Sequence, residues 1–300
     1  MAGNRKITHV AVFGGAGFLG AVIVRHLVSA GIKVRVCARK PGKRSGMEAV
    51  EPVYADIRDE GSLSAALEGC DAAVNAVGLY VEGGSDTFEA VHVRGAANLA
   101  HQCAAANISS FVHMSGIGID PASSSPYVRA RALGEQAVRA VFPETTILRP
   151  SVLFGPDDRF INTLAKIIRH APVIPLFGSG RTKLQAVYVG DVAAAVAKAL
   201  HTPVAAGRTY ELGGPQSPAY RDIVELVMAR IGKKRLLLPV PFALWKVVAA
   251  ASSLLPAPPV TRDQIALMRK DNVVGKSAFS FSDLGIDPTP LESVLPDYAL

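Results

Sequence analysis

A tyrosine and an arginine, Tyr127 and Arg131, lie four residues apart in the stretch SSPYVRARALGEQAV, which reads as the start of a helix. This spacing places both side chains on one helical face. A tyrosine followed at that distance by a lysine would indicate a proton-transfer pair, since a phenol exchanges protons and a cation lowers its pKa. Arginine is not equivalent, because its planar guanidinium differs from an ammonium in reach and geometry. The pair therefore indicates either altered acid–base chemistry or a structural role beside a bound ligand.

Three glycines, Gly14, Gly17 and Gly20, directly follow the apolar run THVAVF and open an apolar helical pattern. Glycines at this spacing permit a tight turn, a close approach of the backbone to a pyrophosphate and close packing of the helix on the strand. The N–H groups at the start of the helix attract phosphates. The motif predicts a dinucleotide-binding site.

Basic residues follow the second expected strand, KVRVCA, where an acidic residue would bind the ribose hydroxyls of NAD(H). Arg39 and Lys40 stand at the tip of this strand, with Lys43 and Arg44 just after it. Because cations suit a 2′-phosphate, NADP(H) is expected over NAD(H). A solvated basic loop explains Lys43 and Arg44 equally well, whereas Arg39 favours the phosphate.

Two further strand ends face the same expected ligand. Asp56, in YADI, either accepts a hydrogen bond from the adenine amino group or caps the following turn. The segment NAVG, residues 75–78, is a loop of small residues that would let the backbone run beside the cofactor.

The elements that must position these residues alternate in type along the first half of the chain. This βαβα order predicts an α/β fold, a doubly wound parallel sheet with a smaller C-terminal lobe. A further strand is expected over 145–155, after which Pro and Gly become frequent. We expect residues 1–155 to form the dinucleotide-binding core, and residues 156–300 to complete it and form the lobe. The expected strands are 8–14, 33–39, 52–57, 71–78 and 110–116, and the expected helices are 17–31, 63–69 and 87–107.

The amino-acid composition limits which classes of molecule are expected to bind this chain. The chain has 300 residues, 49% of them hydrophobic, and a net charge of +7, which favours a compact, somewhat basic protein. Its longest basic run is GKKR, and aromatic residues do not alternate with basic ones, so nucleic acid is not expected as a partner.

Metal and disulfide chemistry are not indicated either. The three cysteines contain no CxxC pair, and His92, His101 and His113 lack metal-ligand spacing, so each histidine is expected to be an ordinary core or surface residue. This use of cysteine favours a reducing cytoplasm. The N-terminus enters a strand without an apolar signal segment, so secretion is not expected.

Together these motifs resemble the extended short-chain dehydrogenase/reductase superfamily and, within it, the atypical branch related to the 39-kDa accessory subunit of NADH:ubiquinone oxidoreductase. The likeness runs along nearly the whole chain. The motifs that carry it are the glycine pattern, ADI near 56, NAVG, HMSGIG with Ser115, Tyr127 twelve residues later, ILRPSVLFGP, VYVGDVA around Asp191 and the ending PTPLESVLPDYAL.

The resemblance implies roles for individual residues. Ser115 and Tyr127 match the catalytic serine and tyrosine of active members, whereas Arg131 stands where those members have the lysine that lowers the tyrosine pKa and holds the nicotinamide ribose. Ligand binding is therefore expected to be retained more than turnover, because the binding motifs are intact and the catalytic motif has changed. The implied cofactor-binding positions are Gly14, Gly17, Phe18, Leu19, Gly20, Arg39, Lys40, Asp56, Ile57, Ala76, Val77, Gly78, Tyr127, Arg131 and Pro150.

An apolar stretch over 236–255 is the other distinctive feature. Prolines interrupt it and Lys246 lies within it, so the helical part, 242–255, is too short to cross a bilayer. This helix either lies on a membrane surface or hydrophobic partner, or covers a substrate cleft of the lobe. The residues on its apolar face are Leu244, Val247, Val248, Ala251 and Leu255.

Two functions remain open. The favoured one is an NADP(H)-binding accessory or assembly factor of a quinone-linked respiratory complex, with little or no turnover, cytoplasmic and peripheral on the inner face of the membrane. The alternative is a free-standing NADP-dependent oxidoreductase or epimerase that acts through Ser115 and Tyr127 on an apolar, quinone- or isoprenoid-like substrate.

Overall fold

The computed structural model describes residues 6–42, 49–252 and 260–299, and the chain falls into two compact units. Unit 1 comprises the chain up to Pro150 together with 189–212 and 276–287. Unit 2 comprises 151–188, 213–275 and 288–300. Lys43 and Arg44 lie outside the described residues.

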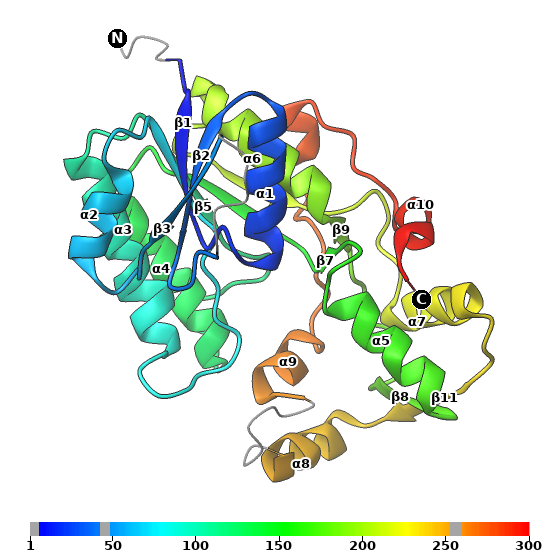
Figure 1. The fold of residues 1–300 in the computed structure, drawn as a ribbon. Helices are drawn as coiled ribbons and strands as arrows, with labels where there is room; N and C mark the ends of the chain where they lie inside the picture. Colours follow the sequence, from blue (N-terminus) through cyan, green and yellow to red (C-terminus); the bar gives the residue numbers. More distant parts are fainter. Residues whose placement is uncertain (1–5, 43–48, 253–259, 300) are drawn as a thin grey trace. The chain divides into compact units, whose positions relative to one another are not determined.

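Unit 1 alternates strands and helices, as the sequence pattern predicts (Figure 1). Its elements are β1 (His9–Phe13), α1 (Phe18–Ser29), β2 (Lys33–Ala38), β3 (Val50–Tyr54), α2 (Glu60–Leu67), β4 (Ala72–Asn75), the π-helix η1 (Glu89–Gly95), α3 (Ala96–Ala105), β5 (Ser110–Met114), α4 (Pro126–Val141), β6 (Thr146–Pro150), α6 (Val189–His201), η2 (Pro203–Ala205), β10 (Thr209–Leu212) and η3 (Phe281–Leu284).

The strands of unit 1 form a seven-stranded parallel sheet in the order β10-β6-β5-β4-β1-β2-β3. The central strands are buried on both faces, which explains their almost continuous apolar sequences. The chain moves outward from β1 in both directions, so the strand order reverses between β1 and β4. The predicted fold class, a doubly wound parallel sheet, is confirmed.

Helices cover both faces of this sheet (Figure 1). Helices α1 and α6 pack against each other on one face, whereas α2, α3 and α4 cover the other. The core under α2–α4 includes the fully buried side chains of Phe13, Leu63, Leu99, Phe111 and Val138. Burial of each such side chain contributes about 1.5–3 kcal/mol, so this layer holds the helices on the sheet.

Unit 2 is built from short strands and helices. Two-stranded parallel ladders join β8 to β11 and β7 to β9, and α5 packs on α7. No helix within the described residues is both long and apolar enough to span a bilayer. The elements are β7 (Leu153–Phe154), α5 (Phe160–His170), β8 (Val173–Phe177), β9 (Val187–Tyr188), α7 (Tyr220–Ile231), β11 (Leu236–Val240), α8 (Phe242–Ser252), α9 (Arg262–Leu267), α10 (Leu291–Val294) and η4 (Leu295–Asp297).

The single strand expected over 145–155 is wrong in detail. The segment divides into β6, which ends at Pro150, and the two-residue β7, which pairs with β9 in a different sheet. Proline has no N–H to donate to a ladder, and the β6 ladder ends there. The break is also the point at which the chain leaves unit 1.

Helix α4 approaches η1 very closely at Gly134. A Cβ atom at this position would lie 2.0 Å from the carbonyl oxygen of His92, far inside van der Waals contact. Because η1 carries His92 and α4 carries Tyr127 and Arg131, this glycine sets the distance between two elements of the candidate site.

We predict that Gly134→Ala lowers the free energy of unfolding by about 2–3 kcal/mol, because the added methyl group forces α4 and η1 apart. Urea denaturation followed by circular dichroism measures the change. Gly61→Ala is the matched control: the nearest atom to its added Cβ is 3.5 Å away, so we expect a change within about 0.5 kcal/mol. An equal effect of the two substitutions would show that the α4–η1 approach is not the cause.

Candidate functional site

The glycine-rich turn after β1 lies where the strand order reverses, the usual location of ligands in open α/β sheets. Gly14 has a φ of +79°, and a Cβ there would lie 2.7 Å from the backbone of Ala76 in the loop after β4. A Cβ at Gly20 would lie 2.1 Å from the Gly14 carbonyl oxygen. Both positions therefore require glycine, and the loops after β1 and β4 meet through backbone atoms.

The start of α1 suits an anionic group. Gly17 is the N-cap residue, no side chain caps the helix, and its first turn contains no acidic residue. The N-terminal N–H groups of such a helix carry partial positive charge and bind phosphates. The residues present thus fit the pyrophosphate of a dinucleotide, with Phe18 and Leu19 in the first turn and Ala76 and Val77 beside Gly14.

The tip of β2 is part of an ion-pair cluster. Arg39 donates two hydrogen bonds, of 2.9 and 2.8 Å, to the carboxylate of Asp86. Arg58 also donates to Asp86, at 2.7 Å, and to Asp56, at 2.6 and 2.9 Å. The Arg58 guanidinium holds the pKa of Asp56 below its usual value.

Asp56 makes the turn contact that was one of its two interpretations from the sequence, and its contact with adenine stays a prediction. Its Oδ1 accepts from the Arg58 backbone N–H at 3.0 Å and so closes the turn after β3. Ile57 beside it is buried in the core, and Lys40 is exposed at the tip of β2.

Tyr127 and Arg131 lie on the first turns of α4. The helix begins at Pro126, and the N-cap Ser125 side chain accepts from the Val128 N–H. The guanidinium carbon of Arg131 lies 5.6 Å from the centre of the Tyr127 ring, in a cation–π arrangement. The predicted pair thus exists, but its cation packs on the face of the ring.

Arg131 extends toward the carboxyl end of β5. Its Nη2 donates to the Met114 carbonyl oxygen at 3.2 Å, while its Nε and the Ser115 hydroxyl are buried and have no hydrogen-bond partner among the described residues. No carboxylate in the described part of the chain forms an ion pair with Arg131. Unpaired buried polar atoms are costly, so these two groups indicate a ligand that supplies their partners.

An ion pair anchors α4 to the sheet. Arg149 of β6 donates to both carboxylate oxygens of the buried Glu135, at 2.9 and 2.7 Å, and approaches Glu211 of β10 at 3.5 Å. Hydrogen bonding to Glu135 raises the pKa of Arg149 and keeps this bridge charged. The bridge fixes the helix one turn beyond Arg131.

Three aromatic rings that the sequence analysis did not assign to the site surround Tyr127. Tyr80 stacks on it at 5.7 Å between ring centres, and Phe88 and His92 approach edge-on at 5.5 and 5.8 Å. Tyr80 is 63% exposed, whereas Phe88 is buried. The spacing of Phe88 and His92, four residues apart on one helical face, was the available signal.

Two histidines beside Arg131 are buried and neutral. His113 contacts the Asn75 side chain at 3.1 Å, and His92 Nε2 lies 2.9 Å from the Leu79 carbonyl oxygen. Burial, and then the charge of Arg131, lower the pKa of both imidazoles to about 3. Both are core residues, as expected from the sequence, but they also place neutral rings around the Arg131 cation.

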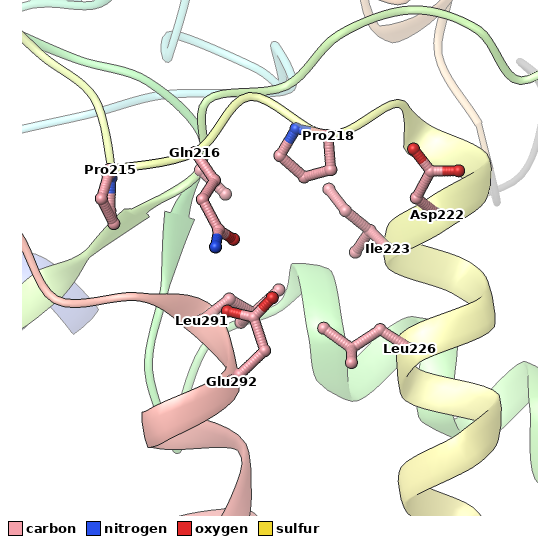
Figure 2. A pocket seen from close by; sticks show the side chains of 9 residues that line it. Pro215, Gln216, Pro218, Asp222, Ile223, Leu226, Leu291 and Glu292 are labelled. Atoms are coloured by element: carbon pink, nitrogen blue, oxygen red, sulfur yellow. The ribbon is translucent and has the colours of Figure 1, made fainter.

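Unit 2 contains a separate hollow, beside α7 and α10 (Figure 2). Figure 2 shows the Gln216 amide and the Glu292 carboxylate at its edge, with Ile223, Leu226 and Leu291 forming its apolar side. None of the site residues predicted from the sequence lines it. The described residues contain no group of three or more His, Cys, Asp or Glu side chains placed to hold a metal ion.

Comparison with known proteins identifies relatives. The model of the NAD dependent epimerase/dehydratase family matches residues 10–213. The chain is 33% identical to the mitochondrial NADH dehydrogenase [ubiquinone] 1 alpha subcomplex subunit 9 of Arabidopsis thaliana, over 94% of this chain and 74% of that protein. It is 31% identical to the mitochondrial NADH-ubiquinone oxidoreductase 40 kDa subunit of Neurospora crassa, over 96% of this chain and 77% of that protein.

A solved structure shows the same fold. The crystal structure of the Citrobacter sp. triphenylmethane reductase complexed with NADP(H) superimposes with a TM-score of 0.76 at 20% identity, over 96% of this chain and 99% of that one. The resemblance indicated by the sequence motifs is thus confirmed, both for the superfamily and for the branch.

We predict that unfolding becomes easier as the pH falls below about 6.5, because the unfolded chain protonates His92 and His113 there, whereas the folded chain does so only near pH 3. Each histidine contributes on the order of 1 kcal/mol per pH unit within this window. Urea unfolding between pH 7 and pH 5 measures the slope. His113→Leu should reduce it by that amount, whatever its effect on absolute stability. An unchanged slope in His113→Leu would contradict the assignment.

Proposed function

Because the chain belongs to the NAD dependent epimerase/dehydratase family, we propose that it binds a nicotinamide dinucleotide and serves as an accessory or assembly subunit of a quinone-linked NADH dehydrogenase complex. Little or no turnover accompanies this role. Two curated relatives that align with nearly the whole chain are named as subunits of such a complex, which supports the partner. We propose a cytoplasmic protein, peripheral on the inner face of the membrane.

The observation that carries the low turnover is the position of Arg131. A guanidinium is always charged and has no acceptor, so it donates hydrogen bonds but does not relay a proton. Here it packs on the Tyr127 ring face and bonds the Met114 carbonyl. It can therefore hold an acceptor group of a ligand, such as a ribose hydroxyl, without supplying the proton-transfer geometry of a lysine.

The cofactor we propose is NADP(H) in preference to NAD(H). The turn from Gly14 to Gly20 would hold its pyrophosphate and Arg39 its 2′-phosphate, while Ser115 Oγ and Arg131 Nε would gain the partners they lack. When bound, the nicotinamide supplies a hydride donor or acceptor. In an accessory subunit, the nucleotide stabilises the folded chain by mass action.

An exposed apolar surface supports peripheral association. Leu244, Val247 and Val248 of α8 are 52%, 62% and 38% exposed, and Leu236 and Leu238 of the preceding strand are also exposed. The opposite side of α8 is anchored, since Trp245 Nε1 donates to the Leu176 carbonyl at 3.0 Å and Ala249 is buried. Leu255, which the sequence placed on this face, lies outside the described residues.

Fractionation of gently solubilised native membranes by size, with mass spectrometry of each fraction, tests the accessory role. We expect the chain to co-migrate with subunits of NADH:quinone oxidoreductase. Val247→Ser should reduce the membrane-bound fraction, because it removes an apolar contact, whereas Val204→Ser, at an equally exposed valine of unit 1, should not. Migration of the wild-type chain alone, in the soluble fraction, would overturn the proposed role.

The alternative is a free-standing oxidoreductase or epimerase for an apolar substrate. Two observations favour it: the aromatic rings around Tyr127, and the buried Ser115 hydroxyl, which has no hydrogen-bond partner within the described part of the chain. Such a site accommodates a planar apolar group and offers a hydrogen bond to its carbonyl.

We expect Tyr127→Phe to leave nucleotide affinity within about twofold and complex association unchanged, because neither property needs the hydroxyl in an accessory role. Arg131→Lys should raise quinone-dependent NADPH oxidation at least about tenfold, as it restores the proton-transfer pair. Initial rates and nucleotide fluorescence provide the measurements. Rapid NADPH oxidation by the wild-type chain that Tyr127→Phe abolishes would favour the enzyme instead.

A further inference from the structure

Asp86 lies beside Arg39 although the two residues are far apart in the sequence. Its carboxylate accepts two hydrogen bonds from Arg39 and one from Arg58, all within 2.9 Å. Three loops meet here: Arg39 follows β2, Arg58 follows β3, and Asp86 precedes η1 in the connection from β4. An acidic group thus stands at the tip of β2, where the local sequence shows only cations.

The turn that carries Asp86 is well defined. Gly83 and Asp86 exchange two backbone hydrogen bonds of 3.0 Å, and the Glu82 carboxylate accepts from the Phe88 N–H at 2.7 Å. The Ser85 hydroxyl and carbonyl accept from Arg58 as well. The backbone hydrogen bonds of this turn and the contacts with Arg58 therefore hold the carboxylate of Asp86 beside Arg39, in addition to the ion pair with Arg39 itself.

The charges of the cluster balance. Two guanidinium groups, Arg39 and Arg58, face two carboxylates, Asp56 and Asp86, so these four side chains carry no net charge together and Lys40 is the neighbouring exposed cation. Arg58 is occupied by both carboxylates and Ser85, whereas the hydrogen bonds of Arg39 go to Asp86. Arg39 is also the more exposed of the two, at 56% against 26%. Both hydrogen bonds to Asp86 come from Nη1 of Arg39, so a 2′-phosphate bound through this guanidinium would share it with the Asp86 carboxylate.

We infer that Asp86 determines the preference of this chain between dinucleotides with and without a 2′-phosphate. Near a ribose with a free 2′-hydroxyl, its carboxylate accepts a hydrogen bond, the role of the acid that the end of β2 lacks. Near a 2′-phosphate, it repels the ligand and holds the guanidinium that would bind it. This inference rests on the proposed dinucleotide binding, and it predicts a weaker NADP(H) preference than the sequence of the β2 tip indicates.

The test measures the dissociation constants of NADPH and NADH for the purified full chain, by the fluorescence of the reduced nicotinamide, at low salt. Asp86→Asn should lower the dissociation constant of NADPH about fivefold and leave that of NADH unchanged or raised, a change that matches the removal of one partly buried charge. Salt should diminish the gain, because the Debye length falls from about 30 Å at 0.01 M to about 3 Å at 1 M.

Glu82→Gln is the matched control. It removes a negative charge from the same turn, from a residue whose hydrogen bond goes to the Phe88 N–H and not to Arg39. We expect it to change the NADPH-to-NADH affinity ratio by less than about twofold. An equal effect of Glu82→Gln and Asp86→Asn would overturn the inference, since general charge would then explain both.

The melting temperature of the nucleotide-free Asp86→Asn variant shows whether it folds. If it folds poorly, Arg39→Gln provides a second test of the inference. Arg39→Gln should raise the dissociation constant of NADPH about fivefold and leave that of NADH unchanged. In the double variant Arg39→Gln/Asp86→Asn, the Asp86→Asn substitution should no longer tighten NADPH binding, because the guanidinium that would gain is absent. A parallel shift of both nucleotides in Asp86→Asn would overturn the inference alone. Failure of the wild-type chain to bind either nucleotide would overturn the proposed function, and this inference with it.

Discussion

The backbone contact between Gly14 and Ala76 is the constraint on which the rest of the site depends. It closes the gap between the loops after β1 and β4 at the point where the strand order reverses, and any Cβ at Gly14 would meet the Ala76 backbone at 2.7 Å. The same β4 loop continues toward Tyr80 and Asp86. This close approach therefore positions the glycine turn against the start of the loop that goes on to carry Tyr80 and Asp86.

The chemistry at the other end of the site is set by a single buried cation. Arg131 has no carboxylate partner among the described residues, and the two neighbouring imidazoles are neutral because burial and the Arg131 charge both disfavour their protonation. Burying a guanidinium without a counter-ion costs free energy, and a ligand that supplies hydrogen-bond acceptors would offset this cost. A guanidinium in this position can donate hydrogen bonds to a ligand, which is the basis of the proposed accessory role.

Unit 2 contributes a different kind of surface. Its α8 is anchored through Trp245 and Ala249, yet it presents Leu244 and Val247 to the solvent. An anchored helix with an exposed apolar face supports association with a lipid surface or a hydrophobic partner. The binding chemistry and the proposed docking surface thus belong to separately packed parts of the chain.

The sequence by itself determined the α/β alternation, the glycine turn and the changed catalytic pair, because each depends on residues that are close along the chain: apolar periodicity, a G-x-x-G-x-x-G spacing and an i, i+4 relation. Only the tertiary structure decided how Arg131 meets Tyr127, that His92 and Phe88 face that ring, and that Asp86 neutralises Arg39. Loops after successive parallel strands converge at one edge of the sheet, so residues remote in sequence become partners there. The sequence at the end of β2 contains only cations, whereas the acidic residue that contacts Arg39, Asp86, lies in the connection between β4 and η1.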